Sequence, residues 1–169
     1  MAALDVGGTV PVVDMPLNDV GGNEWTLAGA LADGPVLLGL YKSSCAASKT
    51  MFPFLQRLHE RYGPRGLRVL GLSQDSENIT RSFARRSGLT FPILLDPEDY
   101  PVSRAFDITA TPTVYLIDPD GTVTATTMGF FADPVNDLAV KVAEAVGAEP
   151  EPVYTEADAA GGTPRFVPG

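Results

Sequence analysis

The chain has 169 residues, and 44% of them are hydrophobic, which fits one soluble globular domain with a sizeable core. Twenty-one acidic residues against twelve basic ones give a formal net charge of −9. A negative charge of this size repels phosphate backbones and anionic lipid surfaces. We therefore expect no nucleic-acid partner and no membrane partner.

One cysteine, Cys45, and one histidine, His59, limit the redox and metal chemistry that is available. A lone cysteine excludes a disulfide within the chain, which fits a reducing compartment. The N-terminal sequence lacks the basic region and apolar run of a secretory signal, and no stretch approaches the ~20 apolar residues of a membrane span. We expect a cytoplasmic protein with no metal site and no cofactor.

The first predicted elements lead from a loop-rich N-terminus to a long helix. Residues 1–34 are rich in glycine, proline and aspartate and predict a small hairpin and a helical turn at the domain edge. Residues 36–41 are almost uniformly apolar, which is typical of a strand covered on both faces. A helical repeat then runs from Cys45 to Gly63, and Pro53 inside it should bend the helix.

Strands and helices then alternate. Residues 67–72 predict a second strand, and Ser76 is a plausible cap for a helix that ends near residue 87, an order that favours a parallel sheet. Further along we expect an extended piece at 91–94, a short helix at 100–106, strands at 113–117 and 122–126, and an amphipathic helix at 134–146. Pro119 and Gly121 suit a tight turn between the last two strands, which must then run antiparallel.

The composition changes after Gly147. Residues 148–169 are rich in proline, glycine and acidic side chains, as in a tail or linker. Phe166 and Val167 could dock on the domain or on a neighbour, but the composition favours a mobile tail. We therefore divide the chain into one domain, residues 1–147, and a C-terminal tail, residues 148–169.

Cys45 stands where the apolar strand gives way to small polar residues and the helix begins. Unpaired N–H groups and the helix dipole at such a position stabilise a thiolate, which makes a cysteine reactive. Ser48 occupies the position where a dithiol motif carries its second cysteine. A hydroxyl there cannot resolve a mixed disulfide, although it can donate a hydrogen bond to the thiolate.

Five features in this order carry a family resemblance. They are the strand that runs into the cysteine turn, Pro53 in the following helix, Leu72-Ser73-Gln74-Asp75, Phe91-Pro92-Ile93-Leu94-Leu95-Asp96, and Ala110-Thr111-Pro112-Thr113 with Tyr115-Leu116-Ile117-Asp118-Pro119-Asp120-Gly121. From about residue 12 to 146 the chain resembles the thioredoxin-like fold, and in particular TlpA/ResA-type members of the AhpC/TSA redoxin superfamily. The resemblance implies an α/β fold with a central mixed β-sheet flanked by helices and an N-terminal hairpin extension.

The chain departs from that family at its chemical positions. Members of the family carry Trp-Cys-Pro-Pro-Cys and then a glutamate, where this chain has Ser44, Cys45, Ser48 and Met51. In the family the first cysteine attacks a disulfide, the second resolves the intermediate and the glutamate assists proton transfer. The resemblance therefore leaves Cys45 as the attacking thiol, with Ser48 beside it as the second candidate catalytic residue.

The resemblance also implies a substrate-binding surface. Ser44 lies at the tryptophan position, and the Thr111–Pro112 bond is expected to be cis and to lie beside Cys45. The backbone of Thr111 is then placed to pair with an extended peptide or to hold a thiol such as glutathione. Two adjacent aromatics, Phe130 and Phe131, would add a substrate-facing patch if they were exposed.

Three functions remain open on this sequence. The first is a thiol-disulfide oxidoreductase that uses Cys45 alone, with an external thiol completing the reaction and with a protein or a low-molecular-weight thiol or disulfide as partner. The second is a one-cysteine peroxidase, although Lys42 and Leu38 replace the hydroxyl and the proline of the peroxidase motif. The third is a redox-inactive binding module that keeps the fold and the groove. The oligomeric state is open as well.

Overall fold

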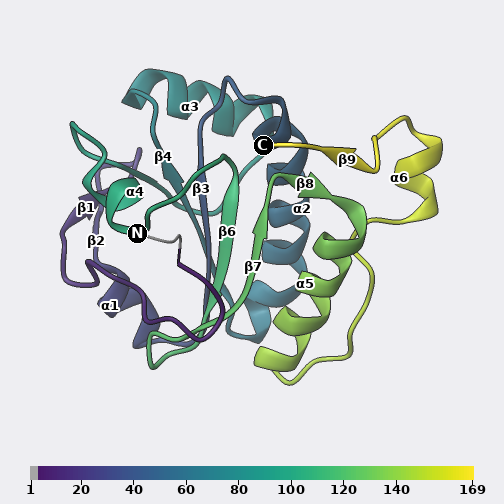
Figure 1. Cartoon of the computed structure of the whole chain (residues 1–169), viewed down its shortest axis with the longest axis horizontal. Helices are drawn as coiled ribbons and strands as arrows, with labels where there is room; N and C mark the ends of the chain where they lie inside the picture. The colour runs from purple at the N-terminus through teal and green to yellow at the C-terminus, as the bar shows by residue number, and fades with distance from the viewer. Residues whose placement is uncertain (1–3) are drawn as a thin grey trace.

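The computed structural model describes residues 4–169 (Figure 1). Its elements in chain order are β1 (Leu17–Asn18), β2 (Glu24–Trp25), α1 (Leu27–Leu31), β3 (Val36–Tyr41), α2 (Ala46–Tyr62), the 3₁₀ turn η1 (Gly63–Arg65), β4 (Arg68–Ser73), α3 (Glu77–Arg86), β5 (Ile93–Leu95), α4 (Pro101–Ala105), β6 (Thr113–Ile117), β7 (Val123–Met128), β8 (Phe130–Phe131), α5 (Ala132–Ala145), α6 (Glu156–Ala160) and β9 (Phe166–Val167). Within the described residues, none of the helices has the length and apolar composition needed to cross a bilayer.

The central sheet is mixed, as the resemblance implied. Its five strands lie in the order β5-β4-β3-β6-β7. β3 runs parallel to β4, and β4 runs parallel to β5, whereas β6 and β7 are antiparallel to their neighbours. β1 and β2 form the expected N-terminal hairpin, and β8 pairs with β9 in a separate two-stranded ribbon. The fold is therefore α/β with helices on both faces of the sheet (Figure 1).

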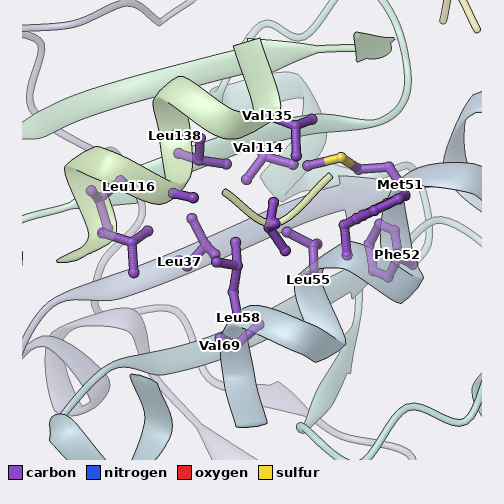
Figure 2. Close-up of a cluster of buried hydrophobic side chains, with 14 of the residues drawn as sticks. Leu37, Met51, Phe52, Leu55, Leu58, Val69, Val114, Leu116, Val135 and Leu138 are labelled. Carbon is purple, nitrogen blue, oxygen red and sulfur yellow. The ribbon is translucent and has the colours of Figure 1, made fainter. Parts of the chain in front are cut away.

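The side chains of β3 alternate between two hydrophobic clusters, because successive residues of a strand point to opposite faces. Leu37 and Tyr41 join the cluster beneath α2 and α5, and Leu38 and Leu40 join the cluster that includes α1 and α4. Figure 2 shows the first cluster, where side chains from the sheet meet those from α2 and α5. Both faces of β3 are buried, which explains its uninterrupted apolar run.

One face of α2 is buried against this cluster along its whole length. Met51, Leu55 and Leu58 are each 0% exposed, and truncating such a side chain to alanine typically costs about 2–5 kcal/mol. Pro53 lies within the helix, as expected. The packing of α2 holds its N-terminus at the end of β3, where Cys45 caps the helix.

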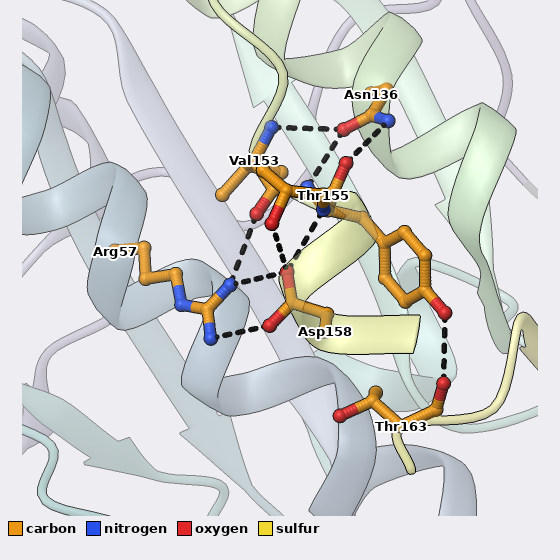
Figure 3. Close-up of polar contacts among 7 residues, drawn as sticks. Arg57, Asn136, Val153, Thr155, Asp158 and Thr163 are labelled. Atoms are coloured by element: carbon orange, nitrogen blue, oxygen red, sulfur yellow. Dashed lines mark hydrogen bonds and ion pairs between the residues drawn. The ribbon is translucent and has the colours of Figure 1, made fainter. Parts of the chain in front are cut away.

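Residues 148–169 do not form the mobile tail that their composition favoured. They contain α6 and β9, and Val153 and Tyr154 belong to the buried core. Two side chains of the domain bind this segment, as Figure 3 shows: Arg57 pairs with Asp158 at 2.7 Å and donates to the carbonyl of Val153, and Asn136 accepts from the backbone N–H groups of Val153 and Tyr154. Polar groups of this segment have partners in the domain, so its polar composition does not prevent it from packing. The boundary at residue 147 stays a prediction.

Candidate functional site

Cys45 lies in the turn between β3 and α2. Its backbone N–H donates to the carbonyl of Lys42 at 3.1 Å, and its own carbonyl accepts from the N–H of Lys49 at 3.2 Å. The turn is also tied to the end of β4, because the N–H of Ser43 donates to Asp75 at 2.8 Å. These contacts place the half-buried thiol at the N-terminus of a 17-residue helix.

The loop before β6 brings Thr111 to Cys45. The thiol donates to the carbonyl oxygen of Thr111, with 3.1 Å between sulfur and oxygen. The Thr111–Pro112 bond is cis, as the resemblance implied. Hydrogen bonds on both sides hold this loop: the Thr113 hydroxyl donates to the carbonyl of Ala110 at 2.7 Å, and the N–H of Gly129 donates to the carbonyl of Pro112 at 2.8 Å.

The pKa of the Cys45 thiol is lower than that of an ordinary cysteine. Partial burial is the largest single effect and raises the pKa, but nearby N–H and O–H groups that favour the thiolate together outweigh it. The backbone N–H of Ser48 lowers the pKa most, followed by the side chain of Thr111, the backbone N–H of Ala47 and the side chain of Ser48. Thr111 acts in both directions, because its carbonyl favours the protonated thiol. Compared with an ordinary cysteine, Cys45 therefore has a larger fraction of thiolate at a given pH, and the thiolate is the nucleophilic form.

Ser48 and Met51 occupy the positions where the related redoxins carry their second cysteine and their glutamate. Ser48 is 0% exposed, and its hydroxyl has no hydrogen-bond partner within normal distance among residues 4–169. Met51 is also 0% exposed and belongs to the hydrophobic cluster, so its position supplies no proton-transfer group. The side chains around Cys45 therefore offer a hydroxyl but neither a second thiol nor a carboxylate at these positions.

The predicted substrate-binding residues differ in exposure, and the structure brings Thr111 into contact with the sulfur of Cys45. Ser44 is exposed, Thr111 is half-buried, and Pro112 is buried. Sequence reasoning did not identify Asp75, which holds the cysteine turn from the end of the neighbouring strand. Its position directly after a buried parallel strand is the signal that could have found it, because the carboxyl ends of β3 and β4 meet at one edge of the sheet.

The aromatic patch forms only in part. Phe130 is 0% exposed and packs in the core, whereas Phe131 is 38% exposed. Phe131 stacks on Phe166 of the C-terminal segment, with ring centroids 6.3 Å apart. Alternation along β8 explains the difference, because adjacent strand residues point to opposite sides. The two exposed aromatics thus come from β8 and β9 and not from one strand.

A surface hollow lies at the C-terminal end of α2, away from Cys45. It has a volume of about 500 Å³, and its lining includes His59, Glu60 and Arg68. Burial lowers the pKa of His59, so the ring is mostly neutral near pH 7. The hollow does not include any of the predicted site residues.

Comparison with known proteins agrees with this geometry. The sequence model of the AhpC/TSA family matches residues 6–126. Two relatives are each named thiol-disulfide oxidoreductase ResA. The protein from Geobacillus kaustophilus is 33% identical over 122 residues, which cover 72% of this chain and 68% of the relative. The protein from Bacillus subtilis is 27% identical over 114 residues, 67% of this chain and 63% of the relative.

Solved structures show the same fold at lower identity. A putative thiol:disulfide interchange protein DsbE from Chlorobium tepidum superposes with a TM-score of 0.76 and 23% identity, covering 86% of this chain and all of that one. The bacterioferritin comigratory protein of Xanthomonas campestris is described by its alkyl peroxide reduction activity. It superposes with a TM-score of 0.70 and 24% identity, covering 84% of this chain and 99% of that one. These likenesses establish the thioredoxin-like fold. With the family match over most of the chain, they show that this protein belongs to the AhpC/TSA family of redoxins and is similar to the thiol-disulfide oxidoreductases within it.

Proposed function

We propose that this protein is a thiol-disulfide oxidoreductase that acts through Cys45 alone and depends on an external thiol to complete each turnover. The observation that carries the proposal is the position of Cys45 at the N-terminus of α2, with hydrogen bonds that lower its pKa. Such surroundings are typical of cysteines that react as nucleophiles. The similarity to the ResA proteins supports the same class of reaction.

The reaction has two steps. The Cys45 thiolate attacks one sulfur of a disulfide, a new bond forms to that sulfur, and the other half leaves as a thiolate that takes a proton from solvent. A thiolate from solution then attacks the mixed disulfide, which forms a new disulfide with the substrate half and returns Cys45 to its thiolate. One disulfide is reduced and one is formed, so no electrons are left over.

The need for an external thiol follows from the side chains beside Cys45. The hydroxyl of Ser48 is a poor nucleophile near neutral pH without a base to activate it. Cys45 is the only cysteine in the chain, so the second thiol must come from another molecule. We propose a protein thiol or a low-molecular-weight thiol for this role, and the cytoplasm as the reducing compartment that supplies it.

Thr111 and Ser44 are our candidates for substrate binding. The carbonyl oxygen of Thr111 lies 3.1 Å from the sulfur of Cys45. Ser44 precedes Cys45 in the chain and is exposed. A disulfide that approaches Cys45 would contact both residues. Pro112 follows Thr111 in the chain, is buried and would shape this wall of the site.

Reaction with glutathione disulfide tests the proposal. Native protein at pH 7 should form a mixed disulfide at Cys45 faster than the same protein unfolded in urea, because unfolding returns the thiol to its ordinary pKa of about 8.5. Intact-mass spectrometry follows the glutathione adduct, which should persist until a thiol is added. The Cys45→Ala variant should form no adduct.

Two results would point to the other functions. If the folded protein formed the adduct more slowly than the unfolded chain, Cys45 would not be activated, and a redox-inactive binding module would fit better. If hydrogen peroxide oxidised Cys45 to a sulfenic acid much faster than glutathione disulfide reacted, a peroxidase would fit better.

A further inference from the structure

The C-terminal strap, defined as residues 164–169, lies against the wall of the Cys45 site. Its strand β9 pairs antiparallel with β8, with Phe130 opposite Val167 and Phe131 opposite Phe166. The N–H of Ala132 extends the pairing by donating to the carbonyl of Arg165 at 2.8 Å. Figure 1 shows β9 leading from α6 back toward α2, and β9 contacts α2.

Glycine at two positions lets the strap approach closely. A Cβ atom added at Gly169 would lie 2.5 Å from the carbonyl oxygen of Thr111, closer than real Cβ contacts come. A Cβ added at Gly129 would lie 2.8 Å from the backbone nitrogen of Gly169 and 3.3 Å from the carbonyl oxygen of Val167. The backbone of the strap therefore touches the same Thr111 carbonyl to which the Cys45 thiol donates.

Separate contacts hold the strap and the segment that leads to it. Val167 is half-buried and packs on the main hydrophobic cluster. Arg165 pairs with Asp133 at 2.7 Å on the surface. Before the strap, the Tyr154 hydroxyl donates to the carbonyl of Thr163 at 2.8 Å, which connects it to the network in Figure 3. The position of the strap is therefore set by packing, pairing and the anchored segment together.

The strap covers the Thr111 side of the Cys45 site, whereas the side of the cysteine turn is exposed. On the side of Thr111, β9 occupies one edge of β8. Another chain cannot add a strand at that edge without displacing the strap. On the side of the cysteine turn, Ser44 and Ala46 are exposed. That exposed side leaves room for a small disulfide, whereas an extended peptide that pairs with the backbone of Thr111 would meet Gly169 of the strap.

We propose that the strap makes Cys45 selective for low-molecular-weight disulfides and excludes extended peptides until it is displaced, a proposal that rests on the proposed function of Cys45. The strap and a partner peptide compete for the edge of β8 and for the space beside Thr111. The apparent affinity for a peptide is then the intrinsic affinity multiplied by the fraction of molecules whose strap is displaced, and any change that opens the strap raises it.

Two probes with the same leaving group test the selectivity. One is 5,5′-dithiobis(2-nitrobenzoate), and the other is an eight-residue extended peptide whose single cysteine carries the same thionitrobenzoate. In both reactions the Cys45 thiolate displaces coloured thionitrobenzoate, so one absorbance measurement gives both rates. Val167→Asp places a charge in the packed position and should release the strap, and Ala160→Asp adds the same charge at an exposed position of α6.

Val167→Asp should raise the peptide rate at least about fivefold and change the small-probe rate by less than about twofold, as expected when a blocked state is opened. Gly169→Leu, which disturbs the strap without adding a charge, should act in the same direction. Ala160→Asp should leave both rates unchanged. Equal peptide rates in the wild type, Val167→Asp and Gly169→Leu would overturn the proposal while leaving the function of Cys45 intact.

A binding measurement separates the strap from the chemistry. In a Cys45→Ser background, the fluorescently labelled peptide without its thionitrobenzoate should bind more tightly when Val167→Asp is added, by a factor similar to the gain in rate. If Cys45 reacted with neither probe, the proposed function would fail, and this affinity would decide the proposal about the strap alone. Unchanged affinity would then overturn it.

Discussion

The two ends of α2 meet the rest of the chain in different ways. At the start of the helix, the thiol of Cys45 makes one hydrogen bond, to the carbonyl of Thr111, and exposed Ser44 leaves one side open. In the second half, Arg57 and Arg61 bind the C-terminal segment through a carboxylate and several backbone carbonyls. At the first end, a single hydrogen bond holds the side chain of Cys45. The second end anchors the C-terminal segment to the domain. Substitutions at the two ends should therefore change different properties.

The largest expected effect is at the reactive end. Cys45→Ser should reduce disulfide exchange to the uncatalysed background, because a hydroxyl without a base does not attack a disulfide. Release of thionitrobenzoate measures the rate, and urea unfolding should give a free energy close to that of the wild type. Residual exchange above background in this variant would show that another group reacts.

The largest effect at the anchoring end concerns stability. Arg57→Ala leaves Asp158, whose side chain is 8% exposed, without its partner, and removes the guanidinium that lies 4.6 Å from the ring centroid of Phe54. Losing one partner of a buried charged contact should lower the free energy of unfolding by about 2–3 kcal/mol. Urea unfolding measures this loss, and Lys141→Ala, which breaks an exposed ion pair, should cost less than about 0.5 kcal/mol.

Cys45 should respond only weakly to Arg57→Ala. Its rate with the small disulfide probe should change by less than about twofold, since the pair lies outside the site and distant changes are usually independent. A large loss of that rate would show that the two ends of α2 are not separable.

Acid should weaken the anchor in a defined pH range. The guanidinium of Arg57 lowers the pKa of Asp158 to about 2, against about 3.9 in the unfolded chain. The stabilisation is complete above pH 4 and is lost as the pH falls through 2, and it amounts to about 1–2 kcal/mol after allowance for the partly exposed arginine. The difference in unfolding free energy between the wild type and Asp158→Asn should shrink over this range. A constant difference would contradict the pairing.

The smallest effect is expected from Ser48→Ala. Removing the hydroxyl should raise the pKa of Cys45 by less than about one unit, because the backbone N–H of Ser48 remains. The pH dependence of alkylation by iodoacetamide measures the pKa. A shift in the opposite direction would mean that the hydroxyl favours the protonated thiol.

Local patterns predicted single elements and placed Cys45 at a helix start, the family resemblance supplied the fold, and long-range contacts explain the packing of the C-terminus. The apolar run at 36–41 and the spacing after Cys45 depend on neighbours in sequence, and β3 and α2 form there. The packing of residues 148–169 depends on Arg57 and Asn136, which lie about a hundred and about twenty residues before their partners. Composition describes the polarity of that segment but not which residues satisfy it.

The same limit applies inside the candidate site. The cysteine turn and Thr111 were recognised from motifs, and the structure brings them into contact. Asp75 was quoted only as part of a family feature and the strap not at all, because each reaches the site through a tertiary contact that its own segment does not encode. A residue that contributes only backbone contacts, such as Gly169, leaves no chemical signal in a sequence.

The central claim, that Cys45 can begin an exchange but cannot finish it alone, is tested most directly by the lifetime of its mixed disulfide. Wild-type protein and Ser48→Cys are each loaded with glutathione, freed of small thiols and followed by intact-mass spectrometry. The wild-type adduct should persist until a thiol is added, whereas Ser48→Cys should release glutathione unaided and form an internal disulfide. Release from the wild type at a similar rate without added thiol would contradict the account.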